Sequence, residues 1–210
     1  MVTQDHYFSA DPKVASRPRT ISITLPDLRF ELDTDRGVFA HGHLDAGTDL
    51  LLRSLGPIPP GELVDVGCGY GAIAITLALR NPDARVWAVD VNHRALDLCA
   101  RNAERAGAGN VVPAEPDAVP ARLKFAAAYS NPPVRLGKPA LHELLLTWIG
   151  RLQPAAAATL VVQRHLGADS LAAWLTGLGH QVERIRSKAG YRILEVHPAA
   201  GSPHDDSRDR

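Results

Sequence analysis

The sequence predicts a doubly wound α/β fold with a mostly parallel sheet of seven strands. From Leu63 onward, short apolar runs alternate with longer segments of helical spacing, a pattern typical of a parallel sheet covered on both faces. A last pair of apolar runs is joined by a short loop, which predicts an antiparallel hairpin at the end of the sheet. Two alternating runs near the N-terminus predict a separate β-hairpin extension.

Each element follows from a local pattern. In the N-terminal hairpin, apolar residues alternate with polar ones around a Pro26-Asp27 turn: Ile21, Ile23 and Leu25 precede it, and Leu28, Phe30 and Leu32 follow it. The runs expected as buried strands are 64–66, 86–89, 111–112, 125–129 and 159–162. The expected helices are 72–80, 94–106, 140–152 and 170–178, and the final antiparallel pair is 182–185 and 191–196, with its loop around 188–190. We expect an N-terminal segment over 1–54, a core over 55–198 and a disordered tail over 199–210.

Composition points to one cytoplasmic domain. With 210 residues, 45% of them hydrophobic, the chain is long enough for a single well-buried core. Lys plus Arg and Asp plus Glu are both 23, so the formal net charge is zero and does not indicate a nucleic-acid partner. The N-terminus has no apolar segment typical of a signal peptide. The longest apolar stretch, 155–162, is far shorter than the ~20 residues that span a bilayer, so we expect no contact with a membrane.

Cysteine and histidine spacing predicts no metal site. Cys68 and Cys99 form neither a close pair nor a metal-binding spacing, which suits a reducing compartment. His41 and His43 lie one residue apart without a third ligand, which is typical of solvated side chains.

A glycine-rich loop over 65–71 lies between the first buried strand and the first helix, where a doubly wound sheet binds its ligand. Its alternate glycines let the backbone pass close to a nucleotide-like cofactor. Asp65 stands in front of the loop, where a carboxylate suits a cationic amino group. Asp90 ends the second strand, where an acid can bind a ribose diol, and Asp117 can accept a hydrogen bond from an adenine amino group. The alternatives are a helix cap or a solvated strand end for Asp65 and Asp90, and a turn for Asp117.

The tripeptide Asn131-Pro132-Pro133 directly follows an expected strand. The two prolines fix their own φ and force the residue before each into extended geometry, so the Asn131 amide is held rigidly at the strand end. A preset carbonyl at this position can accept a hydrogen bond from a planar amine. The alternative is a turn that merely ends the strand.

Together these residues resemble the class I S-adenosylmethionine-dependent methyltransferases, and within them the small-domain group that includes the ribosomal RNA guanine-N2 methyltransferases. The resemblance covers the chain except its tail. It rests on the 65–71 loop and on Arg36-Gly37-Val38-Phe39, Leu44-Asp45-Ala46-Gly47-Thr48, Val89-Asp90-Val91-Asn92, Ser130 to Val134 with Gly137-Lys138, Val162-Gln163 and Gly190-Tyr191-Arg192.

The resemblance implies a Rossmann-like methyltransferase sheet, with S-adenosylmethionine as cofactor. The backbone of the loop would hold the methionine part, the two later acids would hold the ribose and the adenine, and residues 45–48 would cover the cofactor. The residues assigned to the cofactor are Thr48, Asp65, Gly67, Cys68, Gly69, Gly71, Asp90, Val91 and Asp117.

The residues assigned to catalysis are Asn131, Pro132 and Pro133, and those assigned to the substrate are Phe39, Val134, Arg135, Lys138 and Tyr191. Related enzymes often carry an aromatic residue where this chain has Val134, so Phe39 and Tyr191 are the candidates for stacking on a base. The expected function is methyl transfer to guanine-N2 of ribosomal RNA, with RNA as partner. The alternatives are an N-methyltransferase acting on a protein amide or a small-molecule amine, and a non-catalytic cofactor-binding module.

Overall fold

A computed structural model describes residues 10–199, and the expected tail lies outside the described residues from 200 on. The strands are β1 (Arg19–Thr24), β2 (Arg29–Thr34), β3 (Gly61–Val66), β4 (Ala84–Val89), β5 (Val111–Ala114), β6 (Phe125–Ser130), β7 (Leu152–Gln163), β8 (Gln181–Lys188) and β9 (Tyr191–His197). The α-helices are α1 (Ala46–Leu52), α2 (Ala72–Arg80), α3 (His93–Ala106), α4 (Lys138–Ile149) and α5 (Ala168–Gly177). Short 3₁₀ turns are η1 (Pro116–Ala118), η2 (Val134–Leu136) and η3 (Arg164–Leu166).

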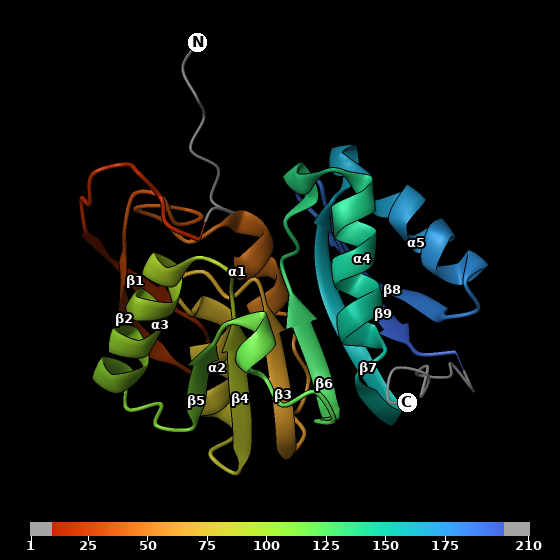
Figure 1. Ribbon diagram of the computed structural model, residues 1–210, viewed down its shortest axis with the longest axis horizontal. Coiled ribbons are helices and arrows are strands. Elements are labelled where there is room, and N and C mark those ends of the chain that lie inside the picture. The colour runs from red at the N-terminus through yellow and green to blue at the C-terminus, as the bar shows by residue number, and fades with distance from the viewer. Residues whose placement is uncertain (1–9, 200–210) are drawn as a thin grey trace, which may run out of the picture.

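The expected doubly wound sheet is confirmed. Seven strands run in the order β5-β4-β3-β6-β7-β9-β8 (Figure 1). The pairs from β5 to β7 are parallel, whereas β9 is antiparallel to both β7 and β8. The N-terminal hairpin β1–β2 forms its own two-stranded sheet. Because the order reverses at β3, the strand ends of β3, β4 and β6 form the switch point at which such sheets bind ligands.

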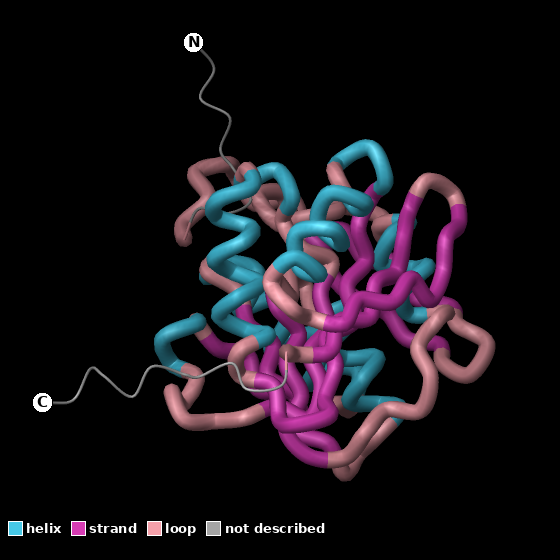
Figure 2. The backbone as a smooth tube through the Cα atoms, turned by 90° about the vertical axis from the view of Figure 1, so that its right-hand side faces the viewer, coloured by secondary structure: helices cyan, strands magenta, loops and turns pink. Residues whose placement is uncertain are grey.

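Both faces of the sheet are buried. Neighbouring residues of one strand enter different cores: Leu63 packs with α1, α2 and α3, whereas Val64 packs with α4 and α5. This follows from the two-residue period of a strand and explains why the parallel strands are mostly apolar instead of alternating. Figure 2 shows helices on both sides of the strands.

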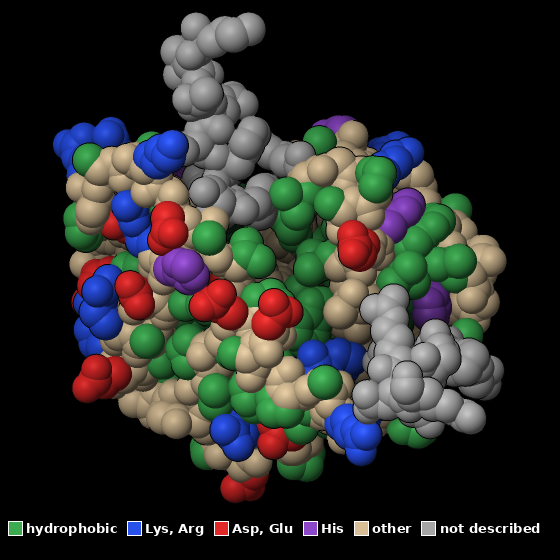
Figure 3. Space-filling model, in the orientation of Figure 1, with side chains coloured by type: hydrophobic (Ala, Val, Ile, Leu, Met, Phe, Trp, Pro, Cys, Tyr) green, Lys and Arg blue, Asp and Glu red, His purple; other side chains and the backbone are tan. Residues whose placement is uncertain are grey.

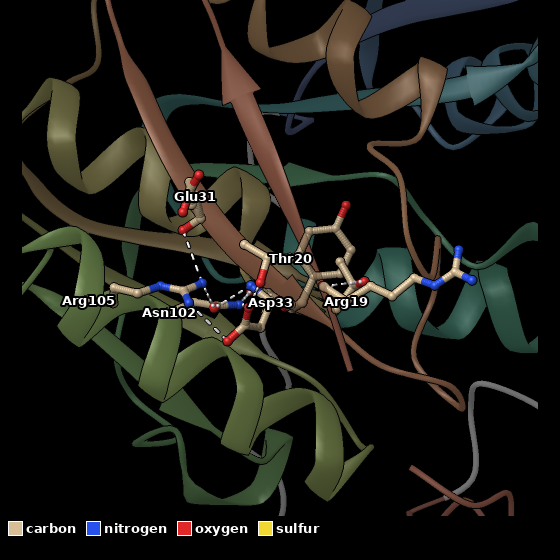
Figure 4. A network of polar contacts seen from close by, with 8 residues as sticks. Arg19, Thr20, Glu31, Asp33, Asn102 and Arg105 are labelled. Atoms are coloured by element: carbon tan, nitrogen blue, oxygen red, sulfur yellow. Dashed lines mark hydrogen bonds and ion pairs between the residues drawn. The ribbon is translucent and has the colours of Figure 1, made fainter. Parts of the chain in front are cut away.

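The hairpin is tied to the core through α3 (Figure 4). Asn102 accepts a hydrogen bond from the Asp33 N–H at 2.8 Å and donates to the carbonyls of Asp33 and Tyr70, both at 2.9 Å. Arg105 adds an ion pair to the Asp33 carboxylate at 3.0 Å. Asn102 is buried. One side chain thus fixes the hairpin and the glycine-rich loop relative to each other.

Two expected boundaries were wrong. Helix α4 ends at Ile149 instead of continuing to 152, and β7 begins at Leu152, well before the expected 159. The start of β7 contains Pro154 and a run of alanines, and both residue types are poor strand formers. Alanine also favours helix, so the composition of this segment does not indicate a strand. Helix α1 was not expected, because its leucines at 50–52 are consecutive and buried and show no helical period.

Candidate active site

A cavity of about 750 Å³ lies at the carboxyl ends of β3, β4, β6 and β7. Its size lies within the range of roughly 300–1,000 Å³ that is usual for small-molecule sites. Figure 3 shows a hollow with hydrophobic side chains at the middle of this face. Of the residues assigned from sequence, those that line the cavity are Phe39, Gly67, Gly69, Asp90, Val91, Asn131, Pro132, Pro133, Val134 and Tyr191.

The N–H groups of the three glycines in the glycine-rich loop are bonded within the protein. Gly67, Gly69 and Gly71 have φ of 74°, 55° and 93°, backbone angles that residues with a side chain rarely adopt. Their N–H groups are engaged within the protein: that of Gly67 with the Val89 carbonyl, that of Gly69 with the Asp90 carboxylate and that of Gly71 with the Cys68 carbonyl. The polar atoms that these three glycines have left for a ligand are therefore their carbonyl oxygens, which suit an ammonium group.

Gly71 and Cys68 are the loop residues that pack against Cys99 of α3. A Cβ atom on Gly71 would lie 2.7 Å from the sulfur of Cys99, so this glycine is required for close packing against α3. Cys68 is buried, and a hydrogen bond with Cys99, together with burial, raises the pKa of its thiol. Neither Gly71 nor Cys68 lines the cavity.

Asp90 is held in a fixed orientation at the end of β4. Its Oδ2 accepts the Gly69 N–H at 2.9 Å, and its Oδ1 accepts the Asn92 N–H at 3.0 Å. Burial raises the pKa of this carboxyl, and the backbone hydrogen bonds oppose that shift. Asn92 in turn donates to the Gly37 carbonyl at 2.7 Å and caps α3, so the segment before Phe39 is held against the same strand end.

Asp65 does not reach the cavity. It is 0% exposed, and its Oδ2 accepts the N–H of Ala74 in the first turn of α2 at 3.0 Å. Within residues 10–199, its Oδ1 has no hydrogen-bond partner. Burial raises the pKa of Asp65 to about 8. The structure thus corrects the expected contact with a cationic group, and the helix-capping alternative describes this residue.

Asp117 is exposed in η1 and lies in a neighbouring hollow of about 530 Å³. This hollow shares Pro116 and Trp148 with the main cavity, but Asp117 itself does not line the main cavity. Pro116, which comes directly before Asp117, lines the main cavity in place of the predicted acid.

Asn131 is oriented by two residues that precede β3. Its Nδ2 donates to Asp45 Oδ2 at 2.8 Å and to Thr48 Oγ1 at 3.0 Å. A carboxylate can only accept hydrogen bonds, so the amide nitrogen must face Asp45, and the carbonyl Oδ1 is left for a ligand. Thr48 is buried and does not line the cavity, so the structure places it behind Asn131 instead of against the cofactor. The Pro132 carbonyl accepts the Val134 N–H at 2.8 Å, which leaves it one further lone pair.

The residues assigned to the substrate divide into two groups. Phe39, which is 43% exposed, and Tyr191 both line the cavity, together with Val134. Lys138 is exposed at the start of α4 and does not line the cavity, and the side chain of Arg135 is outside the described part of the chain. Burial, and to a lesser degree Asp45, raises the pKa of the Tyr191 phenol.

Sequence reasoning missed part of the cavity wall. Leu144 and Trp148, four residues apart on α4, line the wall beside Pro116, and this helical spacing was the available signal. His41 and His43 also line the cavity, although they were expected to be merely solvated. Among residues 10–199, no three His, Cys, Asp or Glu side chains are grouped so as to hold a metal ion, and none of the helices there is long and apolar enough to cross a membrane.

Comparison with known proteins gives a consistent result. The model of a family described as "Methyltransferase small domain" matches residues 29–195. The chain is 35% identical over 196 residues to "Uncharacterized protein YbxB" of Bacillus subtilis (strain 168), covering 91% of this chain and 98% of that one. It is 34% identical over 172 residues to the ribosomal RNA small subunit methyltransferase C of Ectopseudomonas mendocina (strain ymp), covering 75% of this chain and 52% of the relative.

The chain therefore spans about half the length of that relative. The solved structure of the T. thermophilus 16S rRNA N2 methyltransferase RsmC, in complex with AdoMet and guanosine, has the same fold, with a TM-score of 0.73 at 24% identity over 89% of this chain and 52% of that chain. The chain thus belongs to the methyltransferase small domain family.

Proposed function

We propose that this protein transfers a methyl group to the exocyclic amino group, N2, of a guanine in ribosomal RNA. The observation that carries the proposal is the orientation of Asn131, whose amide nitrogen is bound by Asp45 and Thr48 and whose carbonyl remains for a ligand. Asn131 lines the cavity that Gly67, Gly69 and Asp90 also line. A hydrogen-bond acceptor in this place suits a substrate that presents N–H groups.

The residues around the cavity suit S-adenosylmethionine. Gly67 and Gly69 offer carbonyl oxygens for its ammonium group, and the Asp90 carboxylate can accept hydrogen bonds from its ribose hydroxyls. Val91 and Pro116 supply apolar surface for the adenine. When bound, S-adenosylmethionine supplies a methyl group on a positively charged sulfur.

Methyl transfer to an exocyclic amine requires that the nitrogen lone pair leave conjugation with the ring. Hydrogen bonds from the amine to Asn131 Oδ1 and to the Pro132 carbonyl would draw the nitrogen toward tetrahedral geometry and stabilise the positive charge that develops on it. The amine would receive the methyl group from the sulfonium, with an N–C bond in place of the C–S bond, and its excess proton would leave to water. Because the methylated amine is acidic, no side chain has to act as a general base.

A guanine in ribosomal RNA is supported by two further observations. Phe39 and Tyr191 provide aromatic surface on the cavity, where a base can stack. The relative that is 34% identical to this chain is named a ribosomal RNA small subunit methyltransferase. Eight basic residues of the sequence are candidates for an RNA-binding rim, with dispersed surface charge as the alternative. Two of them have protein partners, since Arg192 pairs with Asp169 and Arg186 bonds to Ser54. The remaining cations of that group are Arg17, Arg19, Arg36, Arg135, Lys138 and Lys188.

The proposal is tested with S-adenosylmethionine labelled in its methyl group. The protein is incubated with ribosomal RNA and with small subunits from cells that lack it, and the nucleosides are separated by mass spectrometry. We expect label in N2-methylguanosine. Label confined to another nucleoside would contradict the guanine assignment, and label confined to protein or small molecules would contradict the RNA assignment.

Val134 favours a second candidate, an N-methyltransferase that acts on a protein amide or a small-molecule amine. Val134 lines the cavity next to Pro133, and a valine provides no aromatic face for a base. The Asn131 carbonyl would grip a planar amide nitrogen in the same way. Incubation of labelled cofactor with a protein extract and with a metabolite extract distinguishes this candidate from RNA methylation.

A further inference from the structure

The hydrogen bonds of Asn131 carry an inference that rests on the proposed function and deepens it. We propose that Asp45 is a positioning residue, which fixes the direction of the Asn131 amide and thereby makes the site selective for groups that donate hydrogen bonds.

Both hydrogens of the Asn131 amide are used inside the protein. One is directed to Asp45 Oδ2 at 2.8 Å and the other to Thr48 Oγ1 at 3.0 Å. A primary amide has two donor hydrogens and one acceptor oxygen, so two donated bonds leave only the carbonyl for a ligand. Among residues 10–199, no donor is bonded to that carbonyl, and Asn131 lines the cavity.

Of the two partners, Asp45 decides the direction. The hydroxyl of Thr48 can donate or accept, so it would tolerate the amide turned by 180°. The carboxylate of Asp45 only accepts, so a turned amide would place its oxygen against Oδ2, where the two oxygens repel each other and no hydrogen bond joins them. Thr48 Oγ1 lies 3.5 Å from Asp45 Oδ2, where its own hydrogen can point toward the carboxylate.

Asp45 is itself held in place. It is the N-cap of α1, and its Oδ2 accepts the Thr48 N–H at 2.9 Å. The start of the helix is also closely packed, because Gly47 lies directly against the ring of Tyr191. The same oxygen therefore caps a helix and directs the amide across the cavity edge.

Fixed in this direction, the site presents an acceptor to its substrate. It favours an amino group, which brings N–H donors, over a ring nitrogen or a carbonyl oxygen, which bring lone pairs. Without the bond to Asp45, the Asn131 amide could rotate and bind either kind of group. The selectivity for the atom to be methylated would thus depend on Asp45, which acts through Asn131 although it also lines the cavity.

The test exchanges the two side chains. The variants are Asp45→Asn, Asn131→Asp and the double variant D45N/N131D, with Asp49→Asn on the exposed side of the same helix as matched control. Asn caps a helix as well as Asp does, so D45N keeps α1. In D45N the amide can turn, and kcat for methyl transfer to guanine should fall by about 10²-fold. KM for S-adenosylmethionine should stay within about twofold, because the proposal leaves the loop and Asp90 unchanged.

N131D should also lose activity, because two carboxylates then face each other. In the double variant, the amide now at position 45 can donate to one oxygen of the carboxylate at position 131 and leave the other oxygen as acceptor. Its kcat should return to within about tenfold of the wild type, since the two changes restore one hydrogen bond. Wild-type activity of D45N, or a double variant no better than the single ones, would overturn the proposal.

A second readout does not depend on the substrate. In NMR spectra of the ¹⁵N-labelled protein, the side-chain amide protons of Asn131, identified by their absence in N131D, should exchange with solvent at least about tenfold more slowly in the wild type than in D45N. If these protons are protected but no guanine is methylated, the proposed function fails and the role of Asp45 stands. If they exchange equally fast in both proteins, the role of Asp45 fails whatever the activity.

Discussion

The ring of Tyr191 lies so close to Gly47 that a Cβ atom on Gly47 would be 2.7 Å from Cε1 of the ring. Gly47 belongs to α1, before the first strand of the main sheet, and Tyr191 begins the last strand, β9. The same Cβ atom would lie 2.9 Å from Asp45 Oδ2, the oxygen that binds Asn131. This contact therefore joins α1 and the last strand of the sheet to the amide at the centre of the site.

Gly47→Ala should destabilise the protein. In an unconstrained helix, replacing glycine with alanine stabilises by roughly 0.5–1 kcal/mol, but here the added methyl has to displace the ring. We expect a loss of about 1–3 kcal/mol in the free energy of unfolding, measured with urea. Gly177→Ala at the end of α5 is the control, because no atom lies within 4 Å of its added methyl. A G47A protein as stable as G177A would show that the close contact does not exist.

Asn131→Ala should separate catalysis from binding. It removes the proposed acceptor, so kcat should fall by about 10²–10³-fold. The dissociation constant of S-adenosylmethionine, measured by calorimetry, should change by less than about threefold. Gln153→Ala, which removes an exposed amide at the start of β7, is the control. If N131A complements cells that lack the protein as well as the wild type does, the non-catalytic binding module is favoured over the enzyme.

Asp90→Asn should weaken cofactor binding. Asp90 accepts two backbone N–H bonds, and an amide at this position turns an N–H toward at least one of these donors or toward the ribose. We expect S-adenosylmethionine affinity to fall by about 10–100-fold, since hydrogen bonds to charged groups contribute roughly 1.5–3 kcal/mol. Asp97→Asn on the exposed face of α3 should leave affinity unchanged. Equal affinities of D90N and D97N would remove Asp90 from the cofactor site.

Asp65→Asn should flatten the pH dependence of stability. The pKa of Asp65 is raised from 3.8 to about 8 by burial. Between these values the folded protein holds a proton that the unfolded chain has released. The contribution of Asp65 to stability is thus complete below the lower pKa and is lost as pH rises through the upper one, with a slope of about 1.4 kcal/mol per pH unit.

The measurement is urea unfolding of both proteins without cofactor at several values between about pH 5 and pH 8. The stability of the wild type relative to D65N should fall steadily across this interval. A constant difference between the two proteins would mean that Asp65 is ionised throughout.

Phe39→Ala should weaken the binding of the nucleic-acid substrate. Loss of a stacked aromatic residue costs roughly 1–3 kcal/mol per base, which raises the dissociation constant of RNA by about 5–150-fold. S-adenosylmethionine affinity should not change. Leu178→Ala is the control, because Leu178 on the α5 side of the molecule is 46% exposed against 43% for Phe39. If F39A binds RNA as tightly as L178A does, stacking belongs to another residue.

Periodicity predicted the sheet because buried parallel strands and amphipathic helices have different and visible periods. It did not reveal α1 or the start of β7, where burial and alanine composition conceal the period. The positions of strand ends were likewise predictable, and Asp90 and Asn131 both line the cavity at such ends.

The direction of each side chain was harder to predict. Asp65 and Gly67 are only two residues apart, yet the carboxylate turns beneath the loop to cap α2 while the glycine lines the cavity. The bond between Asp45 and Asn131 joins residues 86 positions apart, and no local pattern contains it. The role of Thr48 depends on that bond, so a single sequence assigns it to the wrong partner.

The order of the strands has a consequence for synthesis on the ribosome. Strand β8 is made before β9 but lies outside it, at the edge of the sheet, so β8 has no strand to pair with until β9 has emerged. An unpaired strand invites aggregation, and charges along it are a common protection. Strand β8 carries Glu183, Arg184, Arg186 and Lys188, all exposed in the finished sheet. These charges can keep the strand in water during the interval in which the nascent chain still lacks its neighbour.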